Sequence, residues 1–378
     1  MPYSVKFHYN ICSLPKGDSD LIIFAIESSC DETSAAVIRA ENDRVDILSN
    51  VVATQIETHA LYGGVVPEIA SRAHLEAIST VAERAIADAD IVTSDIDAVA
   101  VTCAPGLIGA LLVGVSFAKS LAYALGVPLI PVNHIKAHVA AVYPANPELK
   151  PPFYAVVVSG SHTSVYRVTG FTEFDEIGGS RDDAAGEAFD KVGRRLGLAY
   201  PCGAGMDALA AEGFLSALSL KLPSPHLKDT YDFSFSGLKT AAVNLIHNER
   251  QKRDLCDDDP LPDDIRKEIA AVFTRSVTDG IQKCLSSVIA EFGVAPIVLA
   301  GGVAANSHLR NALSTLAKKE GVSFISPSKD LCGDNAAMIG IQGYYEYRAG
   351  ARAGCDLNAY ASEESADANG VFSYETDA

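Results

Sequence analysis

Residues 153–168 read Phe-Tyr-Ala-Val-Val-Val-Ser-Gly-Ser-His-Thr-Ser-Val-Tyr-Arg-Val, and this stretch decides the fold. Its two apolar runs predict two buried strands joined by the polar turn Ser159–Thr163. The same pattern occurs earlier, where the apolar run 21–26 is followed by a polar turn at 27–34 and a second strand at 35–38. Two such units, about one in each half of the chain, indicate an internal duplication.

A third unit, residues 297–306, runs from the strand Ile297-Val-Leu-Ala300 through two glycines towards a helix. We therefore predict an α/β fold with two duplicated domains around a nucleotide cleft. Turns rich in Ser, Thr and Gly expose several backbone N–H groups together, which suits a phosphate. A tight hairpin explains each turn taken singly equally well. We expect the nucleotide to be held between the turns at 159–163 and 301–306, on separate halves.

The composition along the chain predicts its domain organisation. The residues after Gly350 are small and polar and carry six acids against one arginine, which is typical of a disordered tail. We predict the following parts: an N-terminal extension (1–20), an N-terminal α/β domain (21–150, completed by 330–350), a C-terminal α/β domain (151–330) with a helical insertion (about 183–290), and an acidic disordered tail (351–378).

The overall composition is that of a globular protein, with 378 residues of which 48% are hydrophobic and 21% charged. The net charge of −18 argues against sequence-independent binding to nucleic acid. No two of the eight cysteines are spaced as Cys-x-x-Cys, which favours reduced thiols. The first twenty residues do not resemble a signal peptide, and no run approaches the ~18 apolar residues that span a bilayer. We expect a cytoplasmic protein with no membrane contact.

Two histidines four residues apart, His134 and His138, follow the strand-like segment 127–132. On a helix, residues i and i+4 lie on one face, so both imidazoles could reach one metal ion. The best third ligand is Asp334, at the start of another expected helix. Two histidines that share a helical face by chance are the alternative, because two-residue motifs often match by accident.

Six longer motifs identify a family. They resemble, in order, those of the TsaD family with its Kae-type and Qri-type relatives, the tRNA N6-adenosine threonylcarbamoyltransferases once misnamed O-sialoglycoprotein endopeptidases. The resemblance runs from about Leu21 to Tyr347 and implies an actin-like ATPase (ASKHA) fold. The motifs are Ile26-Glu-Ser-Ser-Cys-Asp-Glu-Thr33, Gly63-Gly-Val-Val-Pro-Glu-Ile-Ala-Ser-Arg-Ala-His74, Asn133-His-Ile-Lys-Ala-His138, Asp182-Asp-Ala-Ala-Gly-Glu-Ala-Phe-Asp-Lys191, Phe233-Ser-Phe-Ser-Gly-Leu-Lys239 and Gly301-Gly-Val-Ala-Ala-Asn306.

The resemblance implies roles for individual residues. His134, His138 and Asp334 would bind one divalent metal ion, Fe²⁺ or alternatively Zn²⁺. The implied substrate and nucleotide positions are Val158, Ser159, Gly160, Ser161, His162, Asp190, Gly203, Asp207 and Asn306. The family usually has glycine where Ser161 stands, so we expect this side chain to restrict the backbone of the turn.

The implied reaction transfers a threonylcarbamoyl group from threonylcarbamoyl-AMP to the exocyclic amine of the adenosine adjacent to the anticodon. The tRNAs would be those that read codons beginning with A, and the bound adenine nucleotide would be this donor or ATP. Family resemblance points to a TsaB-like paralogue and a TsaE-like ATPase as partners, with the donor made by a TsaC-like synthase. Organellar relatives act without those partners.

Acidic residues in the first polar turn offer a place for the proton that the amine loses. Asp31 or Glu32 would accept it, or would position water or a metal. Hydrogen bonding of Asx type within the turn is the alternative for both residues. Basic residues that would help to hold tRNA are few, and they form two clusters: Lys191, Arg194 and Arg195, and Arg250, Lys252 and Arg253.

Three other functions are compatible with parts of the pattern. A zinc protease of the His-Glu-x-x-His type is disfavoured, because no glutamate stands between His134 and His138. A small-molecule kinase would use the same hairpins, and a phosphorylated product would distinguish it. A nucleotide-dependent scaffold or chaperone would need no Lewis acid.

Overall fold

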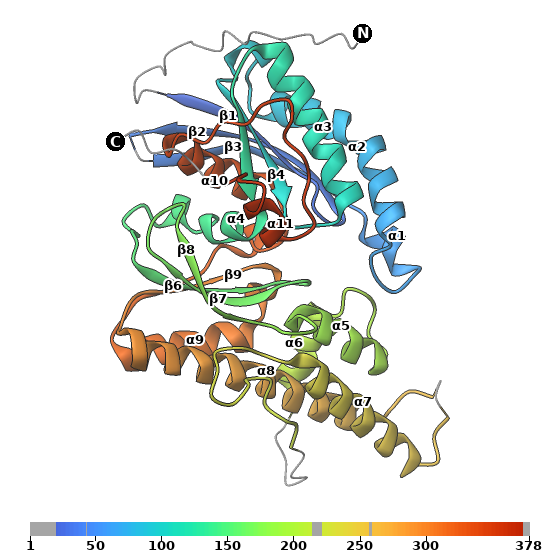
Figure 1. Ribbon diagram of the computed structural model, residues 1–378. Helices are drawn as coiled ribbons and strands as arrows, with labels where there is room; N and C mark the ends of the chain where they lie inside the picture. Colours follow the sequence, from blue (N-terminus) through green and yellow to red (C-terminus); the bar gives the residue numbers. More distant parts are fainter. Residues whose placement is uncertain (1–19, 43, 214–220, 257–258, 373–378) are drawn as a thin grey trace. The chain divides into compact units, whose positions relative to one another are not determined.

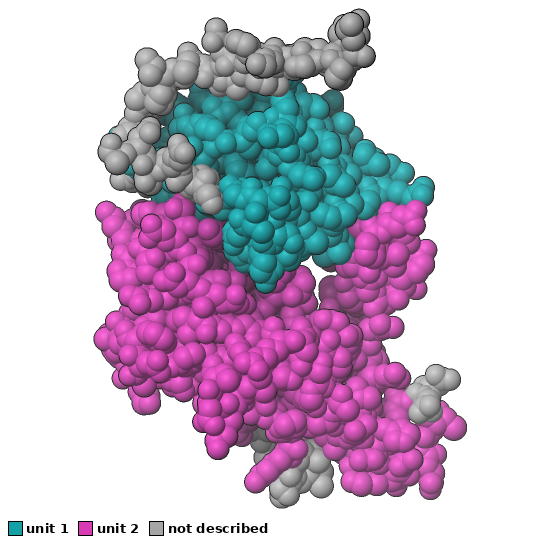
Figure 2. Space-filling view, in the orientation of Figure 1, with its two compact units in different colours: residues 1–53, 71–134, 335–378 teal, residues 54–70, 135–334 magenta. Residues whose placement is uncertain are grey.

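The computed structural model describes residues 20–42, 44–213, 221–256 and 259–372. The chain forms two compact units (Figure 2). Unit 1 comprises residues 1–53, 71–134 and 335–378, and unit 2 comprises residues 54–70 and 135–334. These boundaries differ from the divisions at 150 and 330 that the composition suggested. The chain passes from unit 1 to unit 2 after residue 134, where one helix starts, and returns after residue 334, just before another helix. The predicted extension 1–20 lies, apart from Asp20, outside the described residues.

The sheet of unit 1 has five strands in the order β3-β2-β1-β4-β5 (Figure 1). β1 pairs with β2 antiparallel, and β1, β4 and β5 run parallel to one another. β1 and β4 are almost wholly buried, as expected for strands covered on both faces. The strands are β1 (Leu21–Glu27), β2 (Glu32–Glu41), β3 (Arg44–Thr54), β4 (Ala98–Ala104) and β5 (Leu129–Asn133).

Helices α3 and α10 pack against this sheet. Since α10 contacts β1, β2, β4 and β5, the C-terminal stretch belongs to unit 1. The helices contributed by unit 1 are most of α2 (Pro67–Asp88), η1 (Thr93–Asp95), α3 (Ile108–Leu125), α10 (Ala336–Arg348) and α11 (Glu363–Asp367).

Among the described helices, α3 alone has the length and mean hydropathy to cross a membrane, with 39% of its residues buried. Ser116, Lys119 and Ser120 interrupt its apolar sequence.

The sheet of unit 2 repeats the design of the first, with the order β10-β9-β6-β7-β8. β6, β7 and β8 form an antiparallel meander, while β9 and β10 join β6 in parallel. Because both sheets combine one meander with two parallel strands in the same order, the predicted duplication is confirmed. The strands are β6 (Phe153–Val158), β7 (Thr163–Val168), β8 (Phe174–Gly179), β9 (Ile297–Ala300) and β10 (Phe324–Ile325).

Helices follow β8 before the chain returns to the sheet, in the stretch for which the sequence predicts a helical insertion. The amphipathic α5 and the 30-residue α8 bury apolar faces in one core with the sheet, which includes Phe189 and Phe273 at 5.2 Å between ring centres. The helices of unit 2 are α1 (Ile56–Ala60), α4 (His134–Ala140, from its second residue), η2 (Tyr143–Ala145), α5 (Ala185–Arg195), α6 (Gly203–Glu212), α7 (Phe235–Gln251), α8 (Asp263–Phe292), η3 (Gly302–Ala305), α9 (Ser307–Glu320) and η4 (Lys329–Leu331).

The prediction of a disordered tail from residue 351 is wrong for residues 351–372, and its last six residues lie outside the described part. Leu357, Ala359 and Ala366 are buried in unit 1, and the backbone N–H of Tyr360 donates to the carbonyl of Cys103 at 2.8 Å. The packing of this segment could not be predicted from its polar composition. A few buried apolar residues are enough to hold a segment that also makes backbone hydrogen bonds.

We predict that Leu357→Ala lowers the free energy of unfolding of unit 1 by about 2–3 kcal/mol, the usual cost of truncating a buried leucine. Leu75→Ala is the matched control, since Leu75 on α2 is 65% exposed and its truncation should change little. Urea unfolding of both variants measures this. Equal stability of the two variants would contradict the packed arrangement.

Candidate functional site

Helix α4 starts directly after the buried edge strand β5, and its first residue is His134. His138 follows one turn later on the same face, and both imidazoles are buried, with exposed fractions of 5% and 1%. The predicted pairing of the two histidines on one helix is therefore present in the structure.

The predicted third ligand joins them. Asp334 precedes α10, and its Oδ1 lies 3.2 Å from Nε2 of His138. One ligand atom from each of the three residues lies within 4.8 Å of the other two. Ligands bound about 2.0–2.2 Å from one tetrahedral ion are about 3.3–3.6 Å apart, so small side-chain movements would bring the three ligand atoms onto one ion.

Glu27, at the end of β1, fixes the orientation of His134. It is fully buried, and its Oε2 accepts from Nδ1 of His134 at 3.0 Å and from Thr102 Oγ1 at 2.6 Å. A carboxylate behind Nδ1 selects the tautomer whose Nε2 is a ligand and raises its basicity. The sequence analysis missed this residue. A charged side chain at the end of an apolar strand is the sequence pattern that indicates such a buried, partnered carboxylate.

The donor set fits a divalent transition metal. Two imidazoles and one carboxylate leave coordination positions open, which is the arrangement of non-haem iron sites and also compatible with catalytic zinc. Both histidines are buried, and the carboxylate behind His134 orients one of them, as expected for ligands of a resident ion. His134, His138 and Asp334 would hold it.

The second candidate element is the turn between β6 and β7. Val158 pairs with Thr163, and the N–H of Ser159 donates to the carbonyl of His162 at 2.8 Å, which closes the turn. Gly160 and Ser161 are exposed at its tip. Ser161 is not among the residues with positive φ, so the expected restriction of the backbone by this side chain does not arise.

The glycine turn after β9 packs against the same hairpin. Gly301 has φ +91°, and a Cβ there would collide with the backbone of Val158, so only glycine fits. Because β9 runs parallel to β6, the ends of both strands lie at one sheet edge. The turns at 159–163 and 301–306 therefore belong to the same unit, and the expectation that they sit on separate halves is wrong.

The remaining predicted substrate positions, all in unit 2, make contacts at the first residues of α6 and α9. Asp190 accepts from the N–H of Cys202 at 2.7 Å, directly before Gly203 opens α6. Asp207 on α6 accepts from the N–H and hydroxyl of Ser307, both at 3.0 Å, and Asn306 caps α9 by accepting from Leu309. These contacts gather the predicted residues around the starts of two helices, α6 and α9.

Cysteine chemistry is disfavoured beside this cluster. Burial, with Asp190 nearby, raises the pKa of Cys202 to about 11, so its thiol stays protonated at neutral pH. A protonated and buried thiol is a poor nucleophile.

The first hairpin turn carries the proposed proton acceptors. Asp31 is buried and Glu32 begins β2. His74 on α2 holds the turn, since its Nδ1 lies 2.7 Å from Thr33 Oγ1 and its Nε2 lies 3.0 Å from the carbonyl of Cys30. His74 ends the motif 63–74, and no role for it was predictable from the sequence.

Known proteins resemble this chain along most of its length. The family model TsaD, described as tRNA N6-adenosine threonylcarbamoyltransferase, matches residues 46–341. The chain belongs to the TsaD family. A tRNA N6-adenosine threonylcarbamoyltransferase of Clostridium novyi (strain NT) is 48% identical over 340 residues, which cover 90% of this chain and 96% of the relative. The enzyme of the same description from Thermodesulfovibrio yellowstonii is also 48% identical, over 341 residues, 90% of this chain and 99% of the relative.

TsaD relatives are transferases that act on tRNA, and solved structures agree on the fold. HypF of T. kodakarensis superposes with a TM-score of 0.60 at 14% identity, over 88% of this chain and 48% of HypF. A full-length HypF in a phosphate- and nucleotide-bound form gives a TM-score of 0.55, over 87% of this chain and 46% of that one. The predicted actin-like fold is confirmed.

We predict that purified protein binds close to one transition-metal ion and that His138→Ala binds almost none. Glu27→Gln keeps all three ligands but removes the charge behind His134, so its metal affinity should fall about 10–100-fold. Metal titration with elemental analysis measures both effects. His247→Ala, a change of an exposed histidine on α7, is the control. A Glu27→Gln protein with unchanged affinity would refute the role given to Glu27.

We predict that adenosine monophosphate slows amide exchange at both the 159–163 and the 301–306 turns. The two turns share one sheet edge, so a nucleotide bound there would protect them together. Hydrogen exchange with mass spectrometry measures this, with residues 169–173 of the β7–β8 turn as an internal control. Protection of one turn alone would contradict a shared site.

Proposed function

We propose that this TsaD-family chain transfers the threonylcarbamoyl group of threonylcarbamoyl-AMP to the exocyclic amine of the adenosine adjacent to the anticodon. The substrates would be tRNAs that read codons beginning with A, and the reaction would depend on one divalent metal ion, with Fe²⁺ preferred to Zn²⁺. The cluster of the buried His134 and His138 with Asp334, with Glu27 behind His134, is the observation that carries this proposal.

The reaction forms a C–N bond and breaks the bond between the carbamoyl carbon and the phosphate oxygen. AMP leaves, and the attacking amine loses a proton. A metal held by the triad would supply Lewis-acid polarisation of the donor. Backbone N–H groups of the Ser159–His162 turn would hold the phosphate, and Asn306 and the glycines before it would line the nucleotide.

The proton released from the amine needs an acceptor. Asp31 or Glu32 would take it, because both carboxylates lie in the first hairpin, which His74 holds in one conformation. Of the two, Asp31 is the more buried.

Other functions lack a supporting observation. A metalloprotease would need a base between the histidines, but Lys136 occupies α4 there and its ammonium donates to the carbonyl of Thr172 at 2.9 Å. No contact in the described residues singles out a kinase or a scaffold.

Partners form the second part of the proposal. We expect a TsaB-like paralogue to dock on unit 1, a TsaE-like ATPase to assist turnover, and a TsaC-like synthase to supply the donor in the cytoplasm. Exposed apolar side chains on α2 and α3 of unit 1, namely Leu75, Ile108 and Leu112, support a docking role for these helices.

The test mixes purified chain, synthetic donor and unmodified tRNA, and follows threonylcarbamoyladenosine by mass spectrometry of nucleosides. We predict product with the unaltered chain in the presence of the partner proteins, and at least about 100-fold less with His138→Ala, because the Lewis acid is lost. Efficient multiple turnover by the chain alone would refute partner dependence only. A phosphorylated small molecule formed from ATP, with no modified nucleoside, would refute the transferase proposal.

A further inference from the structure

A basic pocket lies between α5 and α7 of unit 2, and none of the residues assigned to metal or nucleotide lines it. Its volume is about 540 Å³, and it is notable in a chain whose net charge is −18. The residues that line it are Lys191, Arg194, Arg195, Lys239, Thr240 and Val243.

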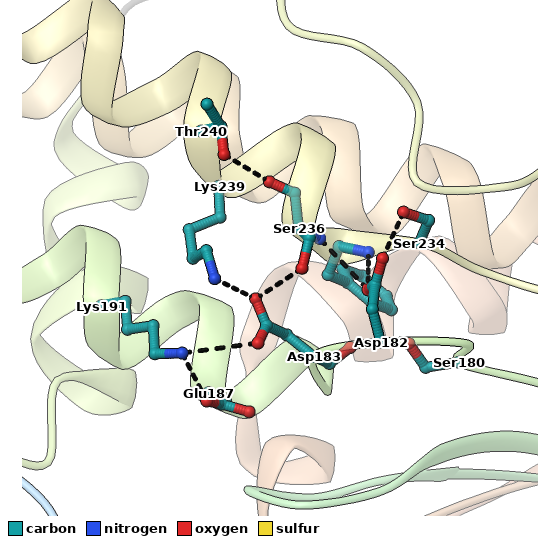
Figure 3. Close-up of polar contacts among 10 residues, drawn as sticks. Ser180, Asp182, Asp183, Glu187, Lys191, Ser234, Ser236, Lys239 and Thr240 are labelled. Atoms are coloured by element: carbon teal, nitrogen blue, oxygen red, sulfur yellow. Dashed lines mark hydrogen bonds and ion pairs between the residues drawn. The ribbon is translucent and has the colours of Figure 1, made fainter.

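The two lysines converge on one carboxylate (Figure 3). Lys191 on α5 lies 3.4 Å from Asp183 and also binds Glu187, while Lys239 on α7 reaches Asp183 from the other side. The hydrogen bond to Glu187 raises the pKa of Lys191, so the lysine stays charged. Two carboxylates thus offset two of the four cations, and the pocket keeps a charge of about +2 on its arginines.

The walls of the pocket are held in place before any ligand arrives. Asp182 accepts from the N–H groups of Phe235 and Ser236, at 2.8 and 3.2 Å, and so fixes the start of α7 (Figure 3). Asp183 also accepts from the hydroxyl of Ser236 at 3.0 Å. A rigid pocket loses little entropy when it binds an anion.

Arg194 links the pocket to an exposed loop. Its Nη1 donates to the carbonyl of Gly63 at 2.6 Å, and a Cβ on Gly63 would collide with the guanidinium. The two residues before Gly63 are Leu61 and Tyr62, which are 84% and 59% exposed. Proteins that bind single-stranded nucleic acid commonly combine an exposed aromatic ring with nearby cations. The phosphates bind the cations, and the bases stack on the ring.

The cations of the second basic cluster are already engaged by groups of the protein itself. Lys252 and Arg253 both pair with the buried carboxylate of Glu249, and Arg250 donates to the carbonyl of Cys256 at 3.2 Å. By contrast, Arg195 makes no hydrogen bond or ion pair with any residue that the structure describes.

Helix α5 connects the pocket to the proposed nucleotide turn. At its start the N–H of Gly186 donates to the carbonyl of Ser159 at 3.2 Å, and at its end stand Arg194 and Arg195. Eight or nine residues of helix span about 12–14 Å, which is short compared with a folded tRNA.

We propose that this pocket binds the phosphate backbone of the tRNA substrate and that Tyr62 stacks on an unpaired base beside it. The inference rests on the proposed function, because it takes tRNA as the substrate. RNA is favoured over a free nucleotide, since none of the nine predicted substrate positions lines the pocket and the stacking residue lies on an exposed loop.

The experiment measures binding of unmodified tRNA to the full chain by fluorescence anisotropy between about 50 and 200 mM salt. Arg195→Ala should raise Kd roughly three- to tenfold and reduce the slope of log affinity against log salt by about 0.7–0.9, the loss of one phosphate contact. Tyr62→Ala should raise Kd with no change in slope. Arg275→Ala, which removes the same charge from an exposed site on α8, is the matched control.

Equal effects of Arg195→Ala and Arg275→Ala would overturn the proposal, because they would show only the influence of net charge. A loss of AMP affinity in Arg195→Ala with tRNA affinity unchanged would also overturn it. Failure of the unaltered chain and its partners to form threonylcarbamoyladenosine would refute the proposed function, and the binding measurements would still decide on the pocket. Where modification does occur, Arg195→Ala should raise KM for tRNA and leave kcat unchanged.

Discussion

The contact between Glu27 and His134 is the interaction on which the candidate site depends. A fully buried carboxylate is costly unless charged or polar partners surround it, and here it accepts from an imidazole and from the hydroxyl of Thr102. The imidazole in turn is held in one tautomer, with the other nitrogen available. One buried group thus joins β1 and β4 to the first residue of α4.

The parallel strands of each sheet place the remaining site elements. Because β6 and β9 run side by side in parallel, the hairpin turn after Val158 and the glycine turn after Ala300 meet at one edge. The close approach of Gly301 to Val158 fixes their distance and tolerates no side chain. Helices α5, α6 and α9 then begin around this edge, and Asp190 and Asp207 hold two of these starts together.

Much of this arrangement could be predicted from the sequence, because it depends on local patterns. Apolar runs interrupted by Ser/Gly turns gave the two hairpins, and the i, i+4 histidines gave the face of α4. What depends on distant packing was not predictable. Glu27 lies 107 residues from His134, and a single acid at a strand end carries no local sign of its partner. The division between the units also depends on contacts between segments that are far apart in the sequence. For this reason the assignment of residues 54–70 to unit 2 was not predictable.

For the C-terminal segment the sequence predicted disorder where the structure shows packing. Residues 351–372 are polar enough to predict disorder, yet Leu357, Ala359 and Ala366 are buried. The backbone of this segment also forms hydrogen bonds with residues of β4 and β5. Composition averages over a segment, whereas packing needs only a few residues in the right places. The same limit applies to the basic residues, whose two clusters look alike in sequence. Lys191, Arg194 and Arg195 line a pocket, whereas Lys252 and Arg253 pair with Glu249.

X-ray absorption spectroscopy of the metal-loaded full chain tests the central claim most directly. Our account predicts two imidazole nitrogens and a carboxylate oxygen at about 2.0–2.2 Å, no sulfur, and further light-atom ligands at open positions. The imidazole signal should fall by half in His138→Ala if any ion remains bound. A sulfur shell, or a spectrum of the unaltered chain with fewer than two imidazoles, would contradict the site built on His134, His138 and Asp334.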